Sequence, residues 1–294
     1  MQNGECRMGN GEWGMENAEW RMQNGECRMG NGEWGMQNGE CRMENAECTN
    51  MRVRAFFVSF ILAFVLGAGS FGQDFQKDVI QTMGGELIIT FIGHGTLIFE
   101  YQEKVIHIDP WSHLADYSEL PKADVILLTH EHGDHFDPTA IEIVSKESTQ
   151  LFLTEICFKK LKKGKIIRNG EYVGAAGLPV EAVPAYNTFA RRGNGKPYHP
   201  KGDGNGYIIT FGDTRVYVAG DTEYYPAMDN MQMIDIAFLP MNLPYTMAPL
   251  MVAICAKAIH PKIVYPYHFG ETKPEELVKL LMHTDIDVRI RSMK

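Results

Sequence analysis

Asp124-Val-Ile-Leu-Leu-Thr-His-Glu-His-Gly-Asp-His135 is the stretch that decides the fold of this chain. Its first half is a run of aliphatic residues typical of a buried strand, and its second half brings three histidines and an aspartate together within six positions. The end of a strand is a rigid support, and Gly133 lets the backbone turn so that alternate side chains converge. Imidazole nitrogens and carboxylate oxygens are the ligands of catalytic zinc. A charged, solvent-exposed turn is the competing interpretation, which the preceding strand disfavours. The stretch therefore predicts a site for two adjacent divalent metal ions, held by His130, His132, Asp134 and His135.

The motif His130-Glu-His-Gly-Asp-His135 resembles the signature loop of metallo-β-lactamase-fold hydrolases. The surrounding sequence resembles the branch that contains L-ascorbate-6-phosphate lactonase and N-acyl-phosphatidylethanolamine phospholipase D more than the antibiotic-degrading enzymes. The resemblance extends from about Gly85 to the C-terminus and implies a four-layer αββα sandwich. The other matching segments follow in the family's order: Ile92-Gly-His-Gly-Thr-Leu-Ile-Phe-Glu100, Ile108-Asp-Pro-Trp111, Val183-Pro-Ala-Tyr-Asn187, Ala219-Gly-Asp-Thr222 and Tyr265-Pro-Tyr-His268.

The resemblance also implies a set of metal ligands and one or two bound ions, with zinc favoured over manganese or iron. Asp221 follows the expected strand 214–218, where a carboxylate can bridge two ions, and an ordinary Gly-Asp turn is the alternative. His268 ends the expected strand 263–267, and a structural core histidine is the alternative for it. The residues that match the family's ligands are His130 and His132 for the first ion, Asp134, His135 and His268 for the second, and Asp221 between them.

The chain departs from the family at the third histidine of the first ion. The phospholipase-like relatives place it in a segment resembling 183–187, where this chain has Asn187, and an amide oxygen is a poor zinc ligand beside imidazole. Either the first ion is held weakly or a residue of the following loop, 191–206, replaces the histidine. His199 is the one histidine of that loop, and three roles stay open: ligand, catalytic contact with substrate, or exposed residue. We expect His199 to face the site and the loop to form a wall of the substrate pocket.

The predicted chemistry follows from the charge of the ions. Divalent ions lower the pKa of a bound water toward 7 and polarise the oxygen of the group under attack. Asp134 is predicted to orient this water and carry its proton, which makes it a candidate catalytic residue as well as a ligand. Asp109 is predicted to hydrogen-bond the free nitrogen of a ligand histidine. His94 is predicted to line or brace the site, with a structural role equally open.

Residues 1–50 are a tandem heptapeptide repeat with Met at every seventh position from Met1 to Met43. A coiled coil needs two apolar positions per heptad that form a continuous seam, and Asn-Gly or Asn-Ala interrupts each repeat here. Because the stretch has almost no aliphatic residues, its composition predicts disorder. A translated nucleotide repeat ahead of the true start is a further hypothesis, with Met51 as the alternative initiator.

Residues 51–72 have the layout of a secretory signal peptide. Arg52 and Arg54 form a basic start, residues 55–66 are apolar apart from one serine, and small residues follow. The apolar run is shorter than the ~20 residues of a spanning helix, which disfavours a membrane anchor. We expect cleavage after Ser70 or Gly72, no stable membrane insertion afterwards, and a periplasmic or secreted protein.

Residues 73–294 are long enough for one domain with a substantial core. The chain has a formal net charge of −9, and apart from a short lysine run at 159–163 it lacks basic clusters, so nucleic acid is not an expected partner. Two cysteines remain after the repeat, Cys157 and Cys255, on separate predicted helices, so no disulfide framework is predicted.

The expected elements alternate between strands and helices in two halves, which favours two packed sheets with helices outside. Strands are expected at 86–91, 96–101, 104–108, 124–129, 149–153, 180–183, 206–211, 214–218, 235–239, 262–267 and 288–291. Helices are expected at 138–148, 155–162, 248–259 and 274–283, and Asp137 with Pro138 has the residue types that begin a helix.

Three functions compete on these grounds. The favoured one is a secreted, metal-dependent hydrolase acting on a small ester, lactone or phosphoester. The resemblance to lipid hydrolases suggests a phosphodiesterase or phospholipase instead, although the mature part has no long amphipathic stretch for membrane docking. A non-catalytic metal-binding protein that retains the fold is the third, and Asn187 is the feature that favours it.

Overall fold

The computed structural model describes residues 26–29, 32–37, 40–44 and 73–294. The chain divides into two compact units, Met1–Ala68 and Gly69–Lys294, and each is described by itself. The signal-peptide prediction for residues 51–72 lies outside the described residues. Within the described part, no helix is both long and apolar enough to cross a membrane.

The second unit contains two seven-stranded sheets in which neighbouring strands are consecutive in the chain. In each sheet the first four strands are antiparallel and the last three are added in parallel. The first sheet holds β4 (Gln76–Thr82), β5 (Gly85–Gly93), β6 (Thr96–Tyr101), β7 (Lys104–Ile108), β8 (Val125–Leu127), β9 (Gln150–Leu153) and β10 (Lys165–Ile166). The second holds β11 (Tyr172–Ala175), β12 (Leu178–Ala185), β13 (Gly204–Phe211), β14 (Thr214–Val218), β15 (Ile236–Pro240), β16 (Ile263–Tyr267) and β17 (Asp287–Val288).

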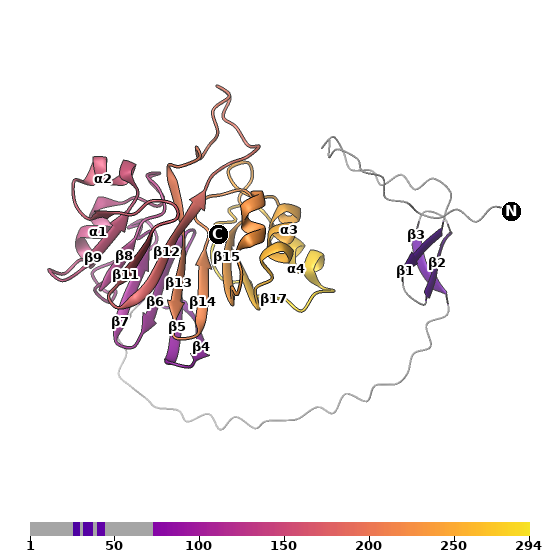
Figure 1. Cartoon of the computed structure of the whole chain (residues 1–294), viewed down its shortest axis with the longest axis horizontal. Helices are drawn as coiled ribbons and strands as arrows, with labels where there is room; N and C mark the ends of the chain where they lie inside the picture. The colour runs from indigo at the N-terminus through magenta and orange to yellow at the C-terminus, as the bar shows by residue number, and fades with distance from the viewer. Residues whose placement is uncertain (1–25, 30–31, 38–39, 45–72) are drawn as a thin grey trace. The chain divides into compact units, whose positions relative to one another are not determined.

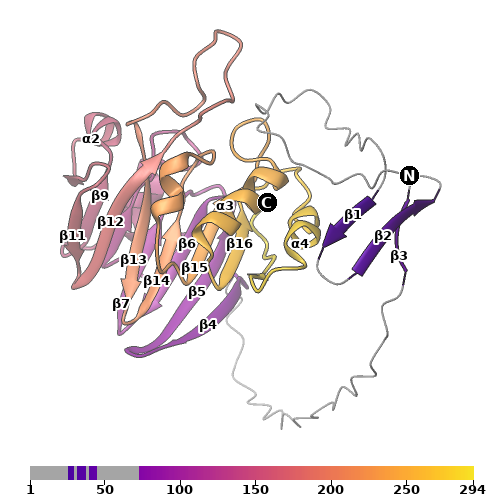
Figure 2. The ribbon, with the colours of Figure 1, turned by 45° about the vertical axis from the view of Figure 1, so that its right-hand side comes forward.

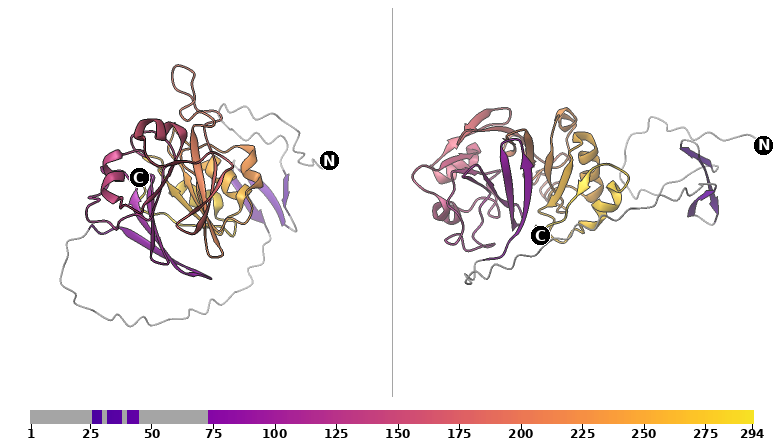
Figure 3. Two further views of the ribbon diagram at one scale, coloured as in Figure 1. Left: turned by 60° about the vertical axis from the view of Figure 1, so that its left-hand side comes forward. Right: turned by 90° about the horizontal axis from the view of Figure 1, so that it is seen from below.

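Helices cover the two outer sides of the paired sheets (Figure 1, Figure 3). The first sheet carries α1 (Pro138–Val144) and α2 (Glu155–Leu161), and the second carries η1 (Pro226–Asn230), α3 (Pro249–Ile259) and α4 (Glu275–Leu281). Asp137 caps α1 by accepting hydrogen bonds from the backbone of Thr139 and Ala140, which confirms the predicted start of this helix. The layers confirm the predicted αββα sandwich.

The apolar run of β8 is continuous because the strand is buried on both faces. Val125 and Leu127 belong to the core between the sheets, whereas Ile126 and Leu128 pack under α1 and α2. Parallel strands covered on both sides have this composition. Because β8 is packed on both faces, the end of the strand from which the following loop starts is fixed.

Several elements differ from the predicted ones. β4 is an edge strand whose side chains are mostly exposed, and its polar sequence gives no apolar alternation to predict it. The predicted elements also do not include β10, β11 and η1. β12 is longer than the predicted 180–183, and the last strand is Asp287–Val288 instead of 288–291.

The first and last segments of the second unit are bonded to each other. Asp78 of β4 accepts two hydrogen bonds from Nη2 of Arg291, at 2.7 and 2.8 Å, and one from its Nε at 2.9 Å. The backbone N of Ser292 donates to Oε1 of Gln76 at 2.8 Å. These contacts hold the edge of the first sheet to the C-terminal segment.

The first unit contains an antiparallel sheet of β1 (Glu26–Met29), β2 (Gly32–Gln37) and β3 (Glu40–Glu44). Over these strands the structure differs from the disorder that the composition predicts, while the rest of the repeat lies outside the described residues. The sequence has Gly30-Asn31 and Asn38-Gly39 between the strands, and dipeptides of this type favour two-residue hairpin connections.

Candidate metal centre

The loop after β8 is fixed where it leaves the strand. Asp109, which follows β7, accepts hydrogen bonds from the backbone N of Thr129 at 2.7 Å and from its Oγ1 at 2.5 Å. Asp109 also lies 2.8 Å from Nδ1 of His135, which leaves Nε2 of that ring turned toward the site. Asp109 is buried and has a φ of 44°, a left-handed conformation that is uncommon for residues other than glycine. Asp109 therefore contacts His135, a candidate ligand, as the sequence predicts for it.

The first cluster of candidate ligands consists of His130, His132 and His199. Nε2 of His130 lies 3.1 Å from Nδ1 of His132, which in turn lies 3.2 Å from Nε2 of His199. Zinc–nitrogen bonds of 2.0–2.1 Å in a tetrahedral site place two ligand nitrogens about 3.3 Å apart. The three nitrogens therefore have the spacing of ligands that share one ion.

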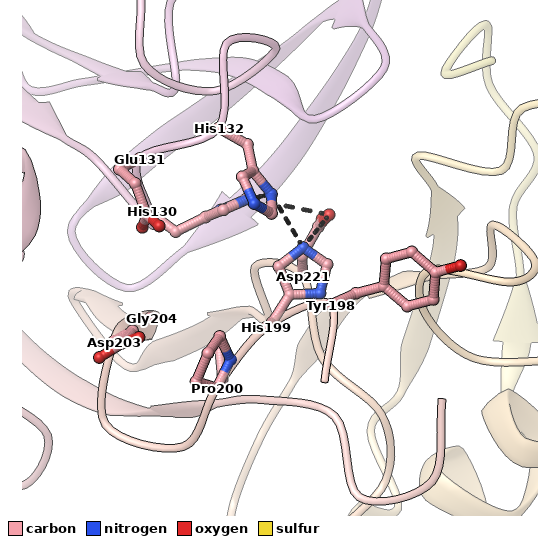
Figure 4. Close-up of a pocket in the computed structure, with 10 residues that line it drawn as sticks. His130, Glu131, His132, Tyr198, His199, Pro200, Asp203, Gly204 and Asp221 are labelled. Atoms are coloured by element: carbon pink, nitrogen blue, oxygen red, sulfur yellow. Dashed lines mark hydrogen bonds and ion pairs between the residues drawn. The ribbon is translucent and has the colours of Figure 1, made fainter. Parts of the chain in front are cut away.

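Asn187 is bonded to His199 and does not itself belong to this cluster. Its Oδ1 accepts hydrogen bonds from the backbone N of His199 at 2.7 Å and from Nδ1 at 2.9 Å. This leaves Nε2 of the buried imidazole facing His132 and Asp221, as Figure 4 shows. The structure thus brings His199, from the following loop, into the first cluster beside His130 and His132, whereas Asn187 stays behind it.

The second cluster consists of His94, Asp134, His135 and His268. Oδ2 of Asp134 lies 3.0 Å from Nε2 of His94, 3.7 Å from Nε2 of His268 and 3.9 Å from Nε2 of His135. The rings of His94 and His268 are 3.7 Å apart, and the backbone N of His268 donates to the carbonyl of His94. His94 lies outside the predicted ligand set, but its contacts with Asp134 and His268 place it at the site, where the sequence predicts it to line or brace the centre.

Asp221 lies between the two clusters and is buried. Its Oδ2 lies 3.2 Å from Nε2 of His199 and 3.4 Å from Nε2 of His268, and its Oδ1 lies 3.5 Å from Nε2 of His135. One carboxylate therefore reaches histidines of both clusters, which is the position that a bridging ligand requires.

The donor set fits divalent cations. Within the described residues, Nε2 of His135, Oδ1 of Asp221 and Nε2 of His268 are buried without a hydrogen-bond partner, and these three atoms lie in the second cluster or between the two clusters. Burial acts to lower the pKa of His135, but the surrounding carboxylates of Asp221, Asp109 and Asp134 raise it to about 10. Burial acts to raise the pKa of Asp221, yet the neighbouring histidines hold it well below its usual range. Carboxylates and imidazoles that converge in this way can be satisfied by positive charge between them.

A cavity of about 340 Å³ opens onto both clusters. The loop 191–206 contributes Arg192, Tyr198 and His199 to its wall, as predicted for the substrate pocket, and this loop extends beyond the ends of the strands in Figure 2. Asn242 and Tyr245, from the segment after β15, complete the wall. No motif in the sequence identifies Arg192, Asn242 or Tyr245 as residues of this wall.

The comparisons with known proteins agree with this geometry. Residues 88–268 match the family model of the β-lactamase superfamily domain. A UPF0173 metal-dependent hydrolase of Thermodesulfovibrio yellowstonii is 31% identical, and the match covers 71% of this chain and 90% of that protein.

Solved structures agree as well. A protein of Parabacteroides distasonis, named as a candidate metal-dependent hydrolase, is 50% identical with a TM-score of 0.72, over 75% of this chain and 100% of that chain. Igni18, a metallo hydrolase of Ignicoccus hospitalis, is 26% identical with a TM-score of 0.59, over 70% of this chain and 95% of that chain. The chain therefore belongs to the β-lactamase superfamily, as a metal-dependent hydrolase with the metallo-β-lactamase fold.

Proposed function

We propose that this chain is a secreted, zinc-dependent hydrolase that cleaves a small ester, lactone or phosphoester with a metal-activated water. The observation that carries the proposal is the pair of ligand clusters that share Asp221 at a solvent-open cavity. His130, His132 and His199 would hold one ion, and Asp134, His135 and His268 the other. Bound ions would supply a hydroxide at neutral pH and polarise the oxygen under attack.

Asp134 is the residue that would move the proton. Its side chain is 36% exposed and lines the cavity, whereas the carboxylate of Asp221 is only 4% exposed. His94 contacts Oδ2 of Asp134 at 3.0 Å and so fixes the direction of the carboxylate. An oriented carboxylate beside the reacting water can accept its proton and return it to the leaving group.

The cavity supports a small substrate. Its volume of about 340 Å³ is within the range of pockets that bind small molecules. Imidazoles, carboxylates and one guanidinium line it, together with two tyrosines. A polar ester or lactone of modest size fits this lining better than a long polymer.

Metal analysis combined with a substrate panel tests the proposal. The purified full chain, loaded with zinc, should contain one to two equivalents and should hydrolyse at least one of a neutral ester, a lactone and a phosphodiester. His132→Ala and Asp134→Ala should lose metal and activity together. His283→Ala is the control, because it changes an exposed histidine that belongs to neither cluster and does not line the cavity, and it should lose neither. Metal bound at full occupancy by both site variants would contradict the ligand assignment. Metal binding without hydrolysis of any substrate would favour the non-catalytic alternative.

The proposed secretion is tested separately. Protein isolated from its native host should begin near Phe71 or Gln73 and should be found outside the cytoplasm. N-terminal sequencing that recovers the heptapeptide repeat would contradict this part of the proposal.

A further inference from the structure

The substrate cavity has a cationic side chain placed beside the candidate ligands. Arg192 is the one lysine or arginine among the described residues that line it. Its Nη2 donates to the carbonyl of Tyr198 at 3.1 Å and lies 3.2 Å from Nε2 of His132, and its guanidinium lies over the Tyr198 ring at 5.1 Å from the centroid. The guanidinium is therefore separated from the converging nitrogens of the first cluster only by the imidazole ring of His132.

The backbone of the loop directs Arg192 to this place. The N of Arg192 donates to the carbonyl of Lys196 at 2.7 Å, and Arg191 forms a β-bridge with Pro197. Within residues 73–294 the side chain of Arg192 forms hydrogen bonds only through Nη2. The N–H groups of Nε and Nη1 therefore remain available to an acceptor in the cavity. A guanidinium offers five donors in a planar fork that matches a carboxylate or a phosphate.

Arg192 contacts the ring nitrogen of His132 that points away from the other two histidines of the cluster. Nδ1 of His132 faces His130 and His199, and Nε2 faces Arg192. A neutral imidazole whose Nδ1 is a metal ligand carries its proton on Nε2, where it can only donate. Two donors cannot share a hydrogen bond, so the guanidinium is then free to bind an acceptor in the cavity.

We infer that Arg192 is the specificity residue of the pocket and binds an oxyanion, a carboxylate or a phosphate, carried by the substrate near the bond that is cleaved. The inference rests on the proposed hydrolase function and names the class of its substrate. The edge-to-face pair of Tyr198 and Tyr245, with centroids 5.0 Å apart, bounds the cavity with flat surfaces beside this anion site.

Two esters with the same leaving group test the inference by turnover. The zinc-loaded full chain should hydrolyse the mono-p-nitrophenyl ester of glutaric acid with a higher kcat/KM than p-nitrophenyl acetate. The ratio of the two kcat/KM values should fall about 10- to 100-fold in Arg192→Ala, the range expected for a charge-assisted hydrogen bond, and less in Arg192→Lys. Arg191→Ala is the matched control, because it removes the same charge from the same loop but from outside the cavity lining. An equal fall of the ratio in both alanine variants would overturn the inference.

A binding measurement keeps this test independent of catalysis. Calorimetric titration of the zinc-loaded full chain with glutarate, and separately with methyl phosphate, shows which oxyanion the pocket prefers. Arg192→Ala should weaken the preferred anion about 10-fold or more at unchanged zinc content, while Arg191→Ala should not. Equal affinity in wild type and Arg192→Ala, or no binding of either anion to the wild type, would overturn the inference. If the anion binds through Arg192 but no ester is cleaved, the hydrolase proposal fails and the anion site stands.

Discussion

Asn187 and His199 form a pair in which the amide aims the imidazole. Both donors of His199 that face Asn187, its backbone N and its Nδ1, are bonded to one oxygen. Partners of this kind set the orientation and basicity of a metal ligand, and their loss costs about 10- to 100-fold in metal affinity.

His199→Ala should therefore lower the zinc content of the chain by about one equivalent, because the first cluster keeps only two imidazoles. Asn187→Ala should retain the ligand but bind zinc about 10- to 100-fold more weakly. Elemental analysis and competition with a chromogenic chelator measure the two effects. His283→Ala provides the control, and full zinc occupancy in His199→Ala would remove this residue from the ligand set.

His107 is a histidine outside the site whose ionisation should affect stability. Its ring is fully buried on β7, and Nε2 lies 2.9 Å from the carbonyl of Pro121. Burial lowers the pKa of His107 to about 4, from 6.5 in the unfolded chain, against a smaller raising effect of the hydrogen bond. The unfolded state therefore binds more protons between these values. The stabilisation is fully present above pH 6.5 and is lost as the pH falls toward 4.

Between pH 7 and pH 5 this group should remove about 2 kcal/mol from the free energy of unfolding. His107→Gln, which keeps a donor for Pro121 but does not ionise, should lack that part of the pH dependence. Urea unfolding of both proteins at the two pH values measures this difference in the free energy of unfolding. The other histidines contribute equally in both proteins, so their titration cancels in the comparison. Parallel loss of stability in both proteins would show that His107 already carries its proton when folded.

At the scale of elements, Glu223 controls the path of the loop between β12 and β13. Its buried carboxylate accepts hydrogen bonds from the backbone N of Thr188, Phe189 and Ala190 at 2.7, 2.6 and 3.0 Å. Glu223 follows Asp221 by two residues, so the strand end that carries the candidate bridging carboxylate also positions the wall that carries Arg192. The sequence Asp-Thr-Glu thus serves the metal centre and the pocket together.

Glu223→Gln should loosen this loop, because an amide offers one acceptor and turns a donor toward backbone N–H groups. Unsatisfied groups of this kind cost about 1–3 kcal/mol, so trypsin should cleave after Arg191 or Arg192 about tenfold faster. Mass spectrometry of the fragments identifies the site. Glu276→Gln, in an exposed residue of α4, is the control for a change of charge. An unaltered cleavage rate in Glu223→Gln would show that the loop is held elsewhere.

The elements that could be predicted from sequence are those with a local cause. The aliphatic run of β8 and the Asp-Pro start of α1 each act over a few residues, and the structure has both. The edge strand β4 could not be predicted in this way, because its partner β5 determines it and its own sequence is polar. The same distinction applies to the site. The motif from His130 to His135 is local and could be predicted, whereas the position of His199 depends on the fold of a long loop. Arg192 and Glu223 carry no motif, and only the folded chain reveals their contacts.

At the scale of the whole second unit, both sheets have the same winding, with four antiparallel strands followed by three parallel ones. Each sheet places an aspartate after its fourth strand, Asp109 after β7 and Asp221 after β14. The first is bonded to a candidate ligand, and the second lies among the candidate ligands of both clusters. The metal centre therefore lies where equivalent ends of the two sheets meet, and neither half contains a complete set of ligands.

The bonds of Asp78 to Arg291 and of Gln76 to Ser292 have a topological consequence. They bring the two ends of the second unit side by side. A short linker could therefore join the ends without crossing a sheet or a helix layer. A circular permutant of residues 73–294, joined by a short glycine–serine linker and opened at the exposed turn Gln102-Glu103, should therefore fold. We expect the same far-UV circular dichroism, zinc content and cooperative melting as in the linear domain. The contradicting result would be loss of cooperative melting in the permutant while the linear domain still melts cooperatively. The order of the strands along the chain, and not only their final neighbours, would then decide whether this sandwich assembles.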